Sequence, residues 1–333
     1  MKEGHIMVEI SNLVKTYGSK YALDDISFTV GTGEILGFLG PNGAGKSTTL
    51  NILTGYLSAN SGTCKIGGVD ILENPDKAKK LIGFLPEQPP LYTDMTVMEY
   101  LNFVYDLKGC SFNRKKHLEE ILAVTKLTEV KKRVIAHLSK GYKQRVGIAQ
   151  ALIGNPKVLV FDEPTVGLDP KQIIEVRNLI RTLGREHTVI LSTHVLSEVQ
   201  AVCDRIVIIN EGEILADEKA DNISAAINKN TRYKIKMCGP QREVLAALKE
   251  TEGVVHAEVT SEREKDSYTY IVEAGGTADV RKTIFALACE NNWPIVGMAP
   301  EGMSLEEVFI KLTDVKSEPK TRSRRRRAER EKE

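Results

Sequence analysis

The stretch Gly40-Pro41-Asn42-Gly43-Ala44-Gly45-Lys46-Ser47 matches the pattern G-x-x-x-x-G-K-[ST] at every fixed position. Residues 34–39 before it read as a strand, and residues 48–53 after it read as the opening of a helix. A strand, a glycine-rich loop and a helix in this order form the setting in which such a loop binds phosphate. A glycine-rich turn with a purely structural role is the alternative, and the complete motif in this setting disfavours it. The sequence therefore predicts a nucleotide site.

Each residue type in this loop has a physical role. Glycine adopts backbone angles that are closed to other residues, so successive N–H groups turn toward phosphate oxygens. The Lys46 ammonium is placed to neutralise the outer phosphates, and the Ser47 hydroxyl is an oxygen ligand of the kind that Mg²⁺ prefers. The start of the helix adds a partial positive charge beneath the same anion.

Length and charge limit the classes of protein. Because 333 residues exceed one average domain, we expect one large domain and a smaller one. The formal net charge is +1, but residues 316–333 carry nine Lys/Arg and four Glu, which leaves −4 for the rest of the chain. The body of the chain is therefore not expected to bind nucleic acid.

Cysteine usage and hydropathy point to a reducing compartment. The five cysteines are dispersed without a C-x-x-C pair, which argues against a disulfide framework or a zinc site. The chain begins with polar residues, so we expect no signal peptide. No apolar run approaches the roughly 20 residues that cross a bilayer. We expect a cytoplasmic chain that works at a membrane only through a partner.

Strand and helix patterns alternate up to about residue 216. Antiparallel strands are expected ahead of the loop at 8–15 and 22–30, and further strands at 81–85, 157–161, 188–192, 205–210 and 213–216. Helices are expected at 96–107, 114–127, 140–152, 173–183 and 195–202, the first with a capping box that starts at Thr96 and the third with Ser139 as its N-cap. This alternation predicts an α/β domain with a largely parallel sheet.

Two acids, Asp162 and Glu163, follow the apolar strand 157–161. One acid can hold the shell of a metal ion while the other polarises water. Solvated loop acids, the alternative, fit poorly after so apolar a strand.

Three further residues are ambiguous taken singly. His194 follows a strand, and a histidine in this position is more often structural than catalytic. Gln88 follows another strand, and a glutamine there is more often an ordinary loop residue than a metal ligand. Tyr17 precedes the turn 18–20, where packing is favoured over stacking on a base.

With the phosphate loop, Gln88, the Ser139 segment, the paired acids, Asp169 and His194 in this order, the chain resembles the ATP-binding subunit of ABC transporters. The resemblance covers about residues 6–220. The sequence of residues 138–142 and 167–172 is most similar to that of the gliding-motility branch of export ATPases. The fold that it implies is the α/β P-loop NTPase fold of ABC ATPases with a helical subdomain.

The resemblance implies a role for each site residue, with ATP and Mg²⁺ bound. Tyr17 would stack on adenine, and the nucleotide would be held by Gly40, Pro41, Asn42, Gly43, Ala44, Gly45, Lys46, Ser47 and Thr48. Ser47, Gln88 and Asp162 would lie at the metal. Glu163 would be the general base, and His194 would contact the γ-phosphate and the attacking water. Ser139 and Gly141 would close over ATP bound to a second copy of the chain, with Asp169 at the seam between the copies.

One departure lies in the family signature L-S-G-G-Q. Residues 138–142 read Leu-Ser-Lys-Gly-Tyr, so Lys140 and Tyr142 stand where the family has a glycine and the glutamine. Ser139 and Gly141 remain, which keeps a helix-dipole contact to a phosphate. The contacts of the family glutamine are not expected here.

The resemblance further implies a domain over 1–221 with a helical subdomain at about 89–155. This domain would dimerise on ATP and drive a separate membrane permease that exports its substrate. The permease would be met near residues 89–107, which places the protein on the inner face of the cell membrane. Rival readings are a soluble ABC-type ATPase acting on a ribosomal or nucleic-acid partner and a nucleotide-gated regulator. The first alternative is disfavoured because such proteins carry a second cassette or a long coiled-coil insertion, and this chain has neither. The second is disfavoured because the paired acids and His194 are intact.

After a linker at 222–230 the pattern reads strand, helix, strand, strand, helix, strand, which suggests a small ferredoxin-like α+β domain over 222–315. Regulatory ligand binding is one role for it, and a dimer-stabilising appendage is the favoured one. Residues 304–312 predict a closing helix with one apolar face. The basic tail 316–333 is expected to be disordered, with attraction to anionic lipid headgroups as a secondary hypothesis.

Overall fold

The computed structural model describes residues 5–111, 113–220, 231–264, 266–275 and 279–300. The expected closing helix at 304–312 and the basic tail lie outside the described residues. The chain divides into two compact units, Met1–Asp221 and Asn222–Glu333, which are described separately below.

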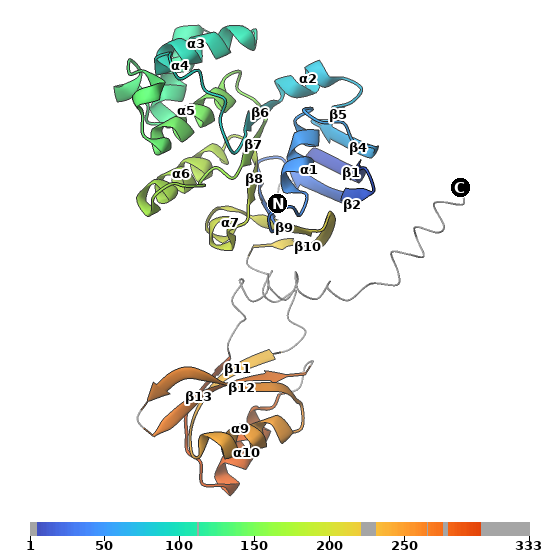
Figure 1. Cartoon of the computed structure of the whole chain (residues 1–333), viewed down its shortest axis with the longest axis vertical. Coiled ribbons are helices and arrows are strands. Elements are labelled where there is room, and N and C mark those ends of the chain that lie inside the picture. The colour runs from blue at the N-terminus through green and yellow to red at the C-terminus, as the bar shows by residue number, and fades with distance from the viewer. Residues whose placement is uncertain (1–4, 112, 221–230, 265, 276–278, 301–333) are drawn as a thin grey trace, which may run out of the picture. The chain divides into compact units, whose positions relative to one another are not determined.

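A six-stranded sheet forms the centre of the first unit (Figure 1). Its strand order is β10-β9-β3-β8-β7-β6, and all neighbours are parallel except β10, which is antiparallel to β9. The strands are β3 (Ile35–Leu39), β6 (Ile82–Leu85), β7 (Val158–Asp162), β8 (Thr188–Thr193), β9 (Arg205–Asn210) and β10 (Glu213–Lys219). Every residue of β3, β7 and β8 is buried, as expected for central parallel strands with both faces covered.

A second, antiparallel sheet of order β2-β1-β4-β5 lies in the same unit. It consists of β1 (Ile6–Tyr17), β2 (Lys20–Gly31), β4 (Ser61–Ile66) and β5 (Val69–Asp70). One apolar core joins residues of both sheets, and within it the rings of Phe28 and Phe38 stack with centroids 5.4 Å apart. The phosphate loop therefore emerges from β3 on a rigid support.

Helices complete the first unit, and α3, α4 and α5 gather at the end away from β1 and β2 (Figure 1). Their bounds are α1 (Lys46–Leu53), α2 (Pro75–Lys80), α3 (Val97–Leu107), α4 (Arg114–Val124), α5 (Lys140–Leu152), α6 (Pro170–Leu183) and α7 (Leu196–Val202), with short 3-10 turns at Thr128–Val130 and Ile135–His137. None of the helices that the structure describes has both the length and the hydropathy to cross a bilayer.

The helix starts follow their capping residues. The predicted capping box of Thr96 and Glu99 is confirmed, and the Ser139 side chain caps α5. The expected start of α6 at residue 173 is wrong by three residues. The Asp169 side chain accepts from Gln172 N at 2.9 Å and Pro170 occupies the first turn, so the helix begins at Pro170.

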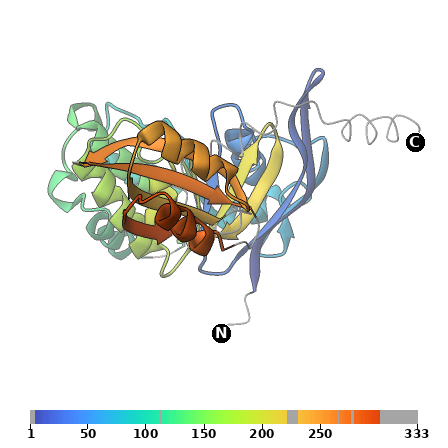
Figure 2. The same cartoon turned by 90° about the horizontal axis from the view of Figure 1, so that it is seen from below.

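The second unit has one antiparallel sheet of order β12-β13-β11-β14. Its elements follow the expected strand and helix order: β11 (Thr231–Cys238), α9 (Gln241–Glu250), β12 (Val254–Glu264), β13 (Ser267–Ala274), α10 (Arg281–Glu290) and β14 (Ile295–Pro300). Both helices lie on the same face of the sheet, as Figures 1 and 2 show together. Along β11, buried Tyr233, Ile235 and Met237 alternate with half-buried basic residues on the opposite face.

Candidate functional site

The loop between β3 and α1 needs glycine at two positions. Gly45 has a φ of 111°, and a Cβ atom there would lie 2.7 Å from the carbonyl oxygen of Ala22. A Cβ at Gly40 would lie 2.3 Å from the carbonyl oxygen of Ile209. Both distances are shorter than any tolerable contact, so the glycines let the loop lie directly against neighbouring backbone. Within the loop the N–H of Ala44 donates to the carbonyl oxygen of Pro41 at 3.2 Å. A loop of this kind presents its remaining N–H groups to a phosphate.

Lys46 lies within the loop that it terminates. Its ammonium donates to the carbonyl oxygens of Gly40 at 2.7 Å and Pro41 at 3.2 Å, and it is only 6% exposed. Burial lowers the pKa of Lys46, and the charges of Glu163 and Asp162 oppose that shift. The loop thus holds a cation on its inner side, where a phosphate could replace the carbonyl oxygens as its partner.

Glu163 and His194 come from the ends of the adjacent strands β7 and β8. Imidazole Nδ1 of His194 lies 2.9 and 3.0 Å from the two carboxylate oxygens of Glu163. The backbone of Glu163 is left-handed, with a φ of 47°, and its N–H donates to the carbonyl of Ser192 at 3.0 Å. The backbone of Glu163 is thus in an uncommon conformation that a hydrogen bond to β8 holds, and its carboxylate faces Lys46 of the phosphate loop.

Asp162 has the chemistry expected of a residue near a metal ion. Its side chain is buried at 6% exposure, and Oδ1 accepts no hydrogen bond from the described residues. A buried carboxylate oxygen without a partner is costly unless a cation or an ordered water meets it. The Ser47 hydroxyl and the Asp162 carboxylate are the hard oxygen donors that Mg²⁺ prefers, so these two residues fit the ion.

A cavity of about 480 Å³ opens at the mouth of the loop. Its lining residues are Tyr17, Lys20, Ala22, Asn42, Gly43, Gly45, Lys46, Ser47, Thr48, Glu87, Glu163, Val166 and His194. Of the residues expected at the phosphates and the metal ion, five are not in this lining: Gly40, Pro41, Ala44, Gln88 and Asp162. Gln88 is exposed, and its neighbour Glu87 lines the cavity. Tyr17 is 54% exposed, so its ring is available to a flat ligand at this cavity.

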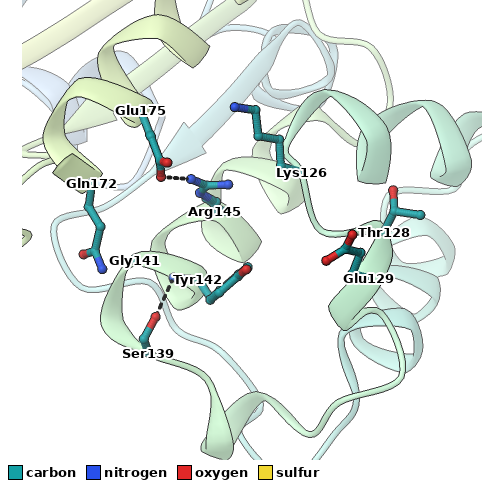
Figure 3. Close-up of a pocket in the computed structure, with 9 residues that line it drawn as sticks. All are labelled: Lys126, Thr128, Glu129, Ser139, Gly141, Tyr142, Arg145, Gln172 and Glu175. Carbon is teal, nitrogen blue, oxygen red and sulfur yellow. Dashed lines mark hydrogen bonds and ion pairs between the residues drawn. The ribbon is translucent and has the colours of Figure 1, made fainter.

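Ser139 and Gly141 line a different cavity, also of about 480 Å³ (Figure 3). Ser139 Oγ accepts from the N–H of Tyr142 at 3.5 Å, at the start of α5. A Cβ at Gly141 would come within 2.7 Å of the Gln172 side chain. Within one chain the signature segment and the phosphate loop therefore line separate cavities. Asp169 lines neither of them and caps α6.

Sequence reasoning missed a buried carboxylate next to the site. Glu198 is 5% exposed and accepts from the hydroxyls of Thr165 at 2.6 and 2.7 Å and Thr193 at 3.0 Å. Arg177 lies 3.9 Å from it. This network joins the turn after Glu163 to the end of the strand before His194. No sequence motif predicts this network, because its threonines and glutamate are far apart in the chain and none belongs to a recognisable pattern.

Known proteins resemble this chain along almost its whole length. The family model described as ABC transporter matches residues 23–166. The bacitracin transport ATP-binding protein BcrA of Bacillus licheniformis is 32% identical over 308 residues, which cover 92% of this chain and 97% of BcrA. The linearmycin resistance ATP-binding protein LnrL of Bacillus subtilis is 32% identical over 309 residues, covering 92% of this chain and 98% of LnrL.

A solved structure agrees with the first unit. The dimeric post-hydrolysis structure of the ATP-binding cassette MJ0796, bound to ADP and Pi, matches with a TM-score of 0.58 and 30% identity. The match covers 64% of this chain and 99% of that one. The fold and the arrangement of the phosphate loop, Lys46, Glu163 and His194 therefore suit the binding and hydrolysis of a nucleoside triphosphate.

Proposed function

The chain belongs to the family of ABC transporter ATP-binding proteins, and we propose that its phosphate-loop cavity hydrolyses Mg²⁺-bound ATP through Glu163. The protein is an ATPase subunit that dimerises and powers a separate permease in export. The observation that carries the assignment of Glu163 is its buried carboxylate, held by His194 at 2.9 Å and facing Lys46 at 3.7 Å.

Each residue has a role in this proposal. The loop N–H groups and Lys46 bind the phosphates, and Tyr17 stacks on adenine. Glu163 accepts a proton from the attacking water, while His194 orients that water and the γ-phosphate. Ser47, Gln88 and Asp162 would hold Mg²⁺, which would neutralise charge on the outer phosphates. Positioning and charge stabilisation supply most of the rate in such reactions.

The second cavity fits a dimer that closes over ATP. Ser139 and Gly141 stand at the N-terminus of α5, a helix of 13 residues, where the helix dipole favours a phosphate. In the proposed dimer they meet the γ-phosphate held by the second copy, with Asp169 at the seam. The separation of the two cavities within one chain supports this arrangement, because neither cavity contains all the proposed groups.

The permease is proposed to contact the segment 89–107. Tyr92 and Leu107 are 51% and 74% exposed there, and Phe103 packs edge-on against Tyr92 with centroids 5.3 Å apart. Tyr92 lies in the loop before α3, and Phe103 and Leu107 lie on α3. Exposed apolar side chains on neighbouring segments are typical of an interaction surface. The protein would then be peripheral on the inner face of the cell membrane.

The exported substrate is proposed to be of the kind named for the relatives, namely bacitracin, linearmycin or a lantibiotic. We keep the gliding-motility branch as a second proposal for the lineage, supported by residues 138–142 and 167–172. Expression together with the cognate permease in a sensitive host tests the first proposal. Raised resistance to one of these compounds, lost with Glu163→Gln, is expected, and unchanged resistance to all three contradicts it.

For the domains, we propose an ATP-binding domain over 1–221 with a helical subdomain at about 89–155, an accessory domain over 222–315 and a basic tail over 316–333. The strand order and antiparallel pairing of the second unit support a ferredoxin-like assignment. A dimer-stabilising role is proposed for it. For the tail we propose contact with anionic lipid headgroups, which co-sedimentation with anionic vesicles before and after deletion of 316–333 tests.

The experiment for the transport function is a pull-down from solubilised native membranes with tagged Glu163→Gln protein and ATP. Recovery of a polytopic membrane protein, together with ATPase activity of the unsubstituted protein, is the expected result. Recovery of ribosomes or DNA-associated proteins in its place would contradict the transport assignment.

A further inference from the structure

The signature helix α5 is held near its end by a buried tyrosine from α3. Tyr100 is 2% exposed, and its hydroxyl donates to the side-chain oxygen of Gln150 on α5. The carbonyl oxygen of Pro90 lies 3.4 Å from the same hydroxyl. One phenol therefore touches both the helix that begins after Ser139 and the loop that follows Gln88.

The same loop packs directly on α5. A Cβ atom at Gly147 would lie 3.0 Å from Pro89 and 2.6 Å from Leu85, so the absence of a side chain lets loop and helix touch. A close-packed contact of this kind transmits a displacement, since there is no space to absorb it. A shift of the loop relative to α3 therefore moves α5, or breaks its hydrogen bond to Tyr100.

A cation from α3 holds the C-terminal end of α5. Lys108 donates to the carbonyl oxygens of Gln150 at 3.3 Å, Ala151 at 3.4 Å and Ile153 at 2.7 Å. The last turn of α5 contains no basic residue of its own. Lys108 thus gives the last carbonyls of α5 a donor and complements the negative end of the helix dipole. The positive end of that dipole is at Ser139.

We propose that Tyr100 is a positioning residue that ties α5 to the loop at Pro89 and Pro90. With Lys108 as a second anchor, which ties α5 to the end of α3, it sets the position of Ser139. A displacement of the segment 89–107 would then reach the signature segment through these two side chains. This inference rests on the proposed role of Ser139 at the ATP of a second copy.

The test compares Tyr100→Phe with Tyr105→Phe in the full-length protein. Tyr105 is also buried on α3, but its ring packs on Arg114 and His117 of α4. Hydrogen exchange of residues 139–152 is measured first, without nucleotide. We expect about fivefold faster exchange in Tyr100→Phe, the effect of one lost hydrogen bond, and no change there in Tyr105→Phe.

ATP-driven dimerisation is measured next, with both substitutions made in Glu163→Gln protein. Tyr100→Phe is expected to weaken dimerisation about fivefold while ATP affinity of the monomer stays unchanged. A Gln150→Met substitution should produce the same loss and add nothing to Tyr100→Phe, because both remove one bond. A general loss of stability would instead lower ATP affinity as well.

Equal exchange and equal dimerisation in Tyr100→Phe and Tyr105→Phe would overturn the inference. Failure of the Glu163→Gln parent to dimerise with ATP would overturn the proposed role of Ser139, and the exchange comparison would still decide whether Tyr100 positions α5.

Discussion

The Nζ atom of Lys46 lies 3.7 Å from Oε1 of Glu163, and each side chain is less than a tenth exposed. The ammonium and the carboxylate therefore face one another as an ion pair beside the phosphate loop. In the proposed function, a bound phosphate would compete with Glu163 for Lys46 and would release the carboxylate toward water. The carboxylate of the proposed base would then be available to water only when a phosphate is bound at the loop.

Glu163→Gln is expected to keep ATP binding while turnover falls by roughly a hundredfold or more, because the amide cannot accept the proton. Phosphate release and nucleotide affinity are measured on the same protein. Glu87→Gln is the matched control, since Glu87 lines the same cavity, while the described hydrogen bonds of His194 go to Glu163. Near-normal turnover in Glu163→Gln would remove Glu163 as the base.

Lys46→Ala is expected to weaken nucleotide binding itself, by about tenfold to a hundredfold, because charge-assisted hydrogen bonds to phosphate are lost. Titration calorimetry with ATP provides the measurement. Lys20→Ala removes an exposed lysine from the lining of the same cavity and serves as the control. A comparable loss in both variants would point to net charge rather than to the position of Lys46.

Thr165→Val is expected to lower kcat and leave KM for ATP nearly unchanged. The substitution keeps the shape of the side chain but removes a buried hydrogen bond to Glu198, at a cost of about 1 kcal/mol in stability. Thr165→Ser should restore kcat, because it restores the hydroxyl. If serine fails to rescue, the Glu198 network does not hold the turn after Glu163 in place.

The stability of the protein relative to Lys108→Met is expected to rise with pH above about 8. Burial lowers the pKa of Lys108 to about 8 from an ordinary value of 10.5. Between these two values the unfolded chain binds the proton that the folded chain has released, so the free energy of unfolding increases with pH. Below about 8 both states are protonated and the difference between the two proteins should be constant.

Denaturant unfolding of both proteins at several pH values measures this difference. Cys110 and His117 are titratable neighbours of Lys108, so the pair is compared again with Cys110→Ser and at pH values where His117 is neutral. A difference that falls as the pH rises past 8 would show that Lys108 is not buried as the charged group described.

The sequence alone determined the features whose chemistry lies within a few consecutive residues. The phosphate loop is one of them, since its glycines, Lys46 and Ser47 are neighbours in the chain. The capping box at Thr96 and the cap at Ser139 are others, because each cap bonds to an N–H group three residues later. The alternation of strands and helices was likewise legible, since hydrophobic periodicity is local.

Only the tertiary structure decided which distant groups meet. The pairing of Glu163 with His194 depends on the register of β7 against β8, and the choice of Glu87 over Gln88 at the cavity depends on how one loop leaves β6. The hold of α3 on α5 joins residues about fifty positions apart. Such contacts are set by the packing of whole elements, which no short pattern of residues encodes.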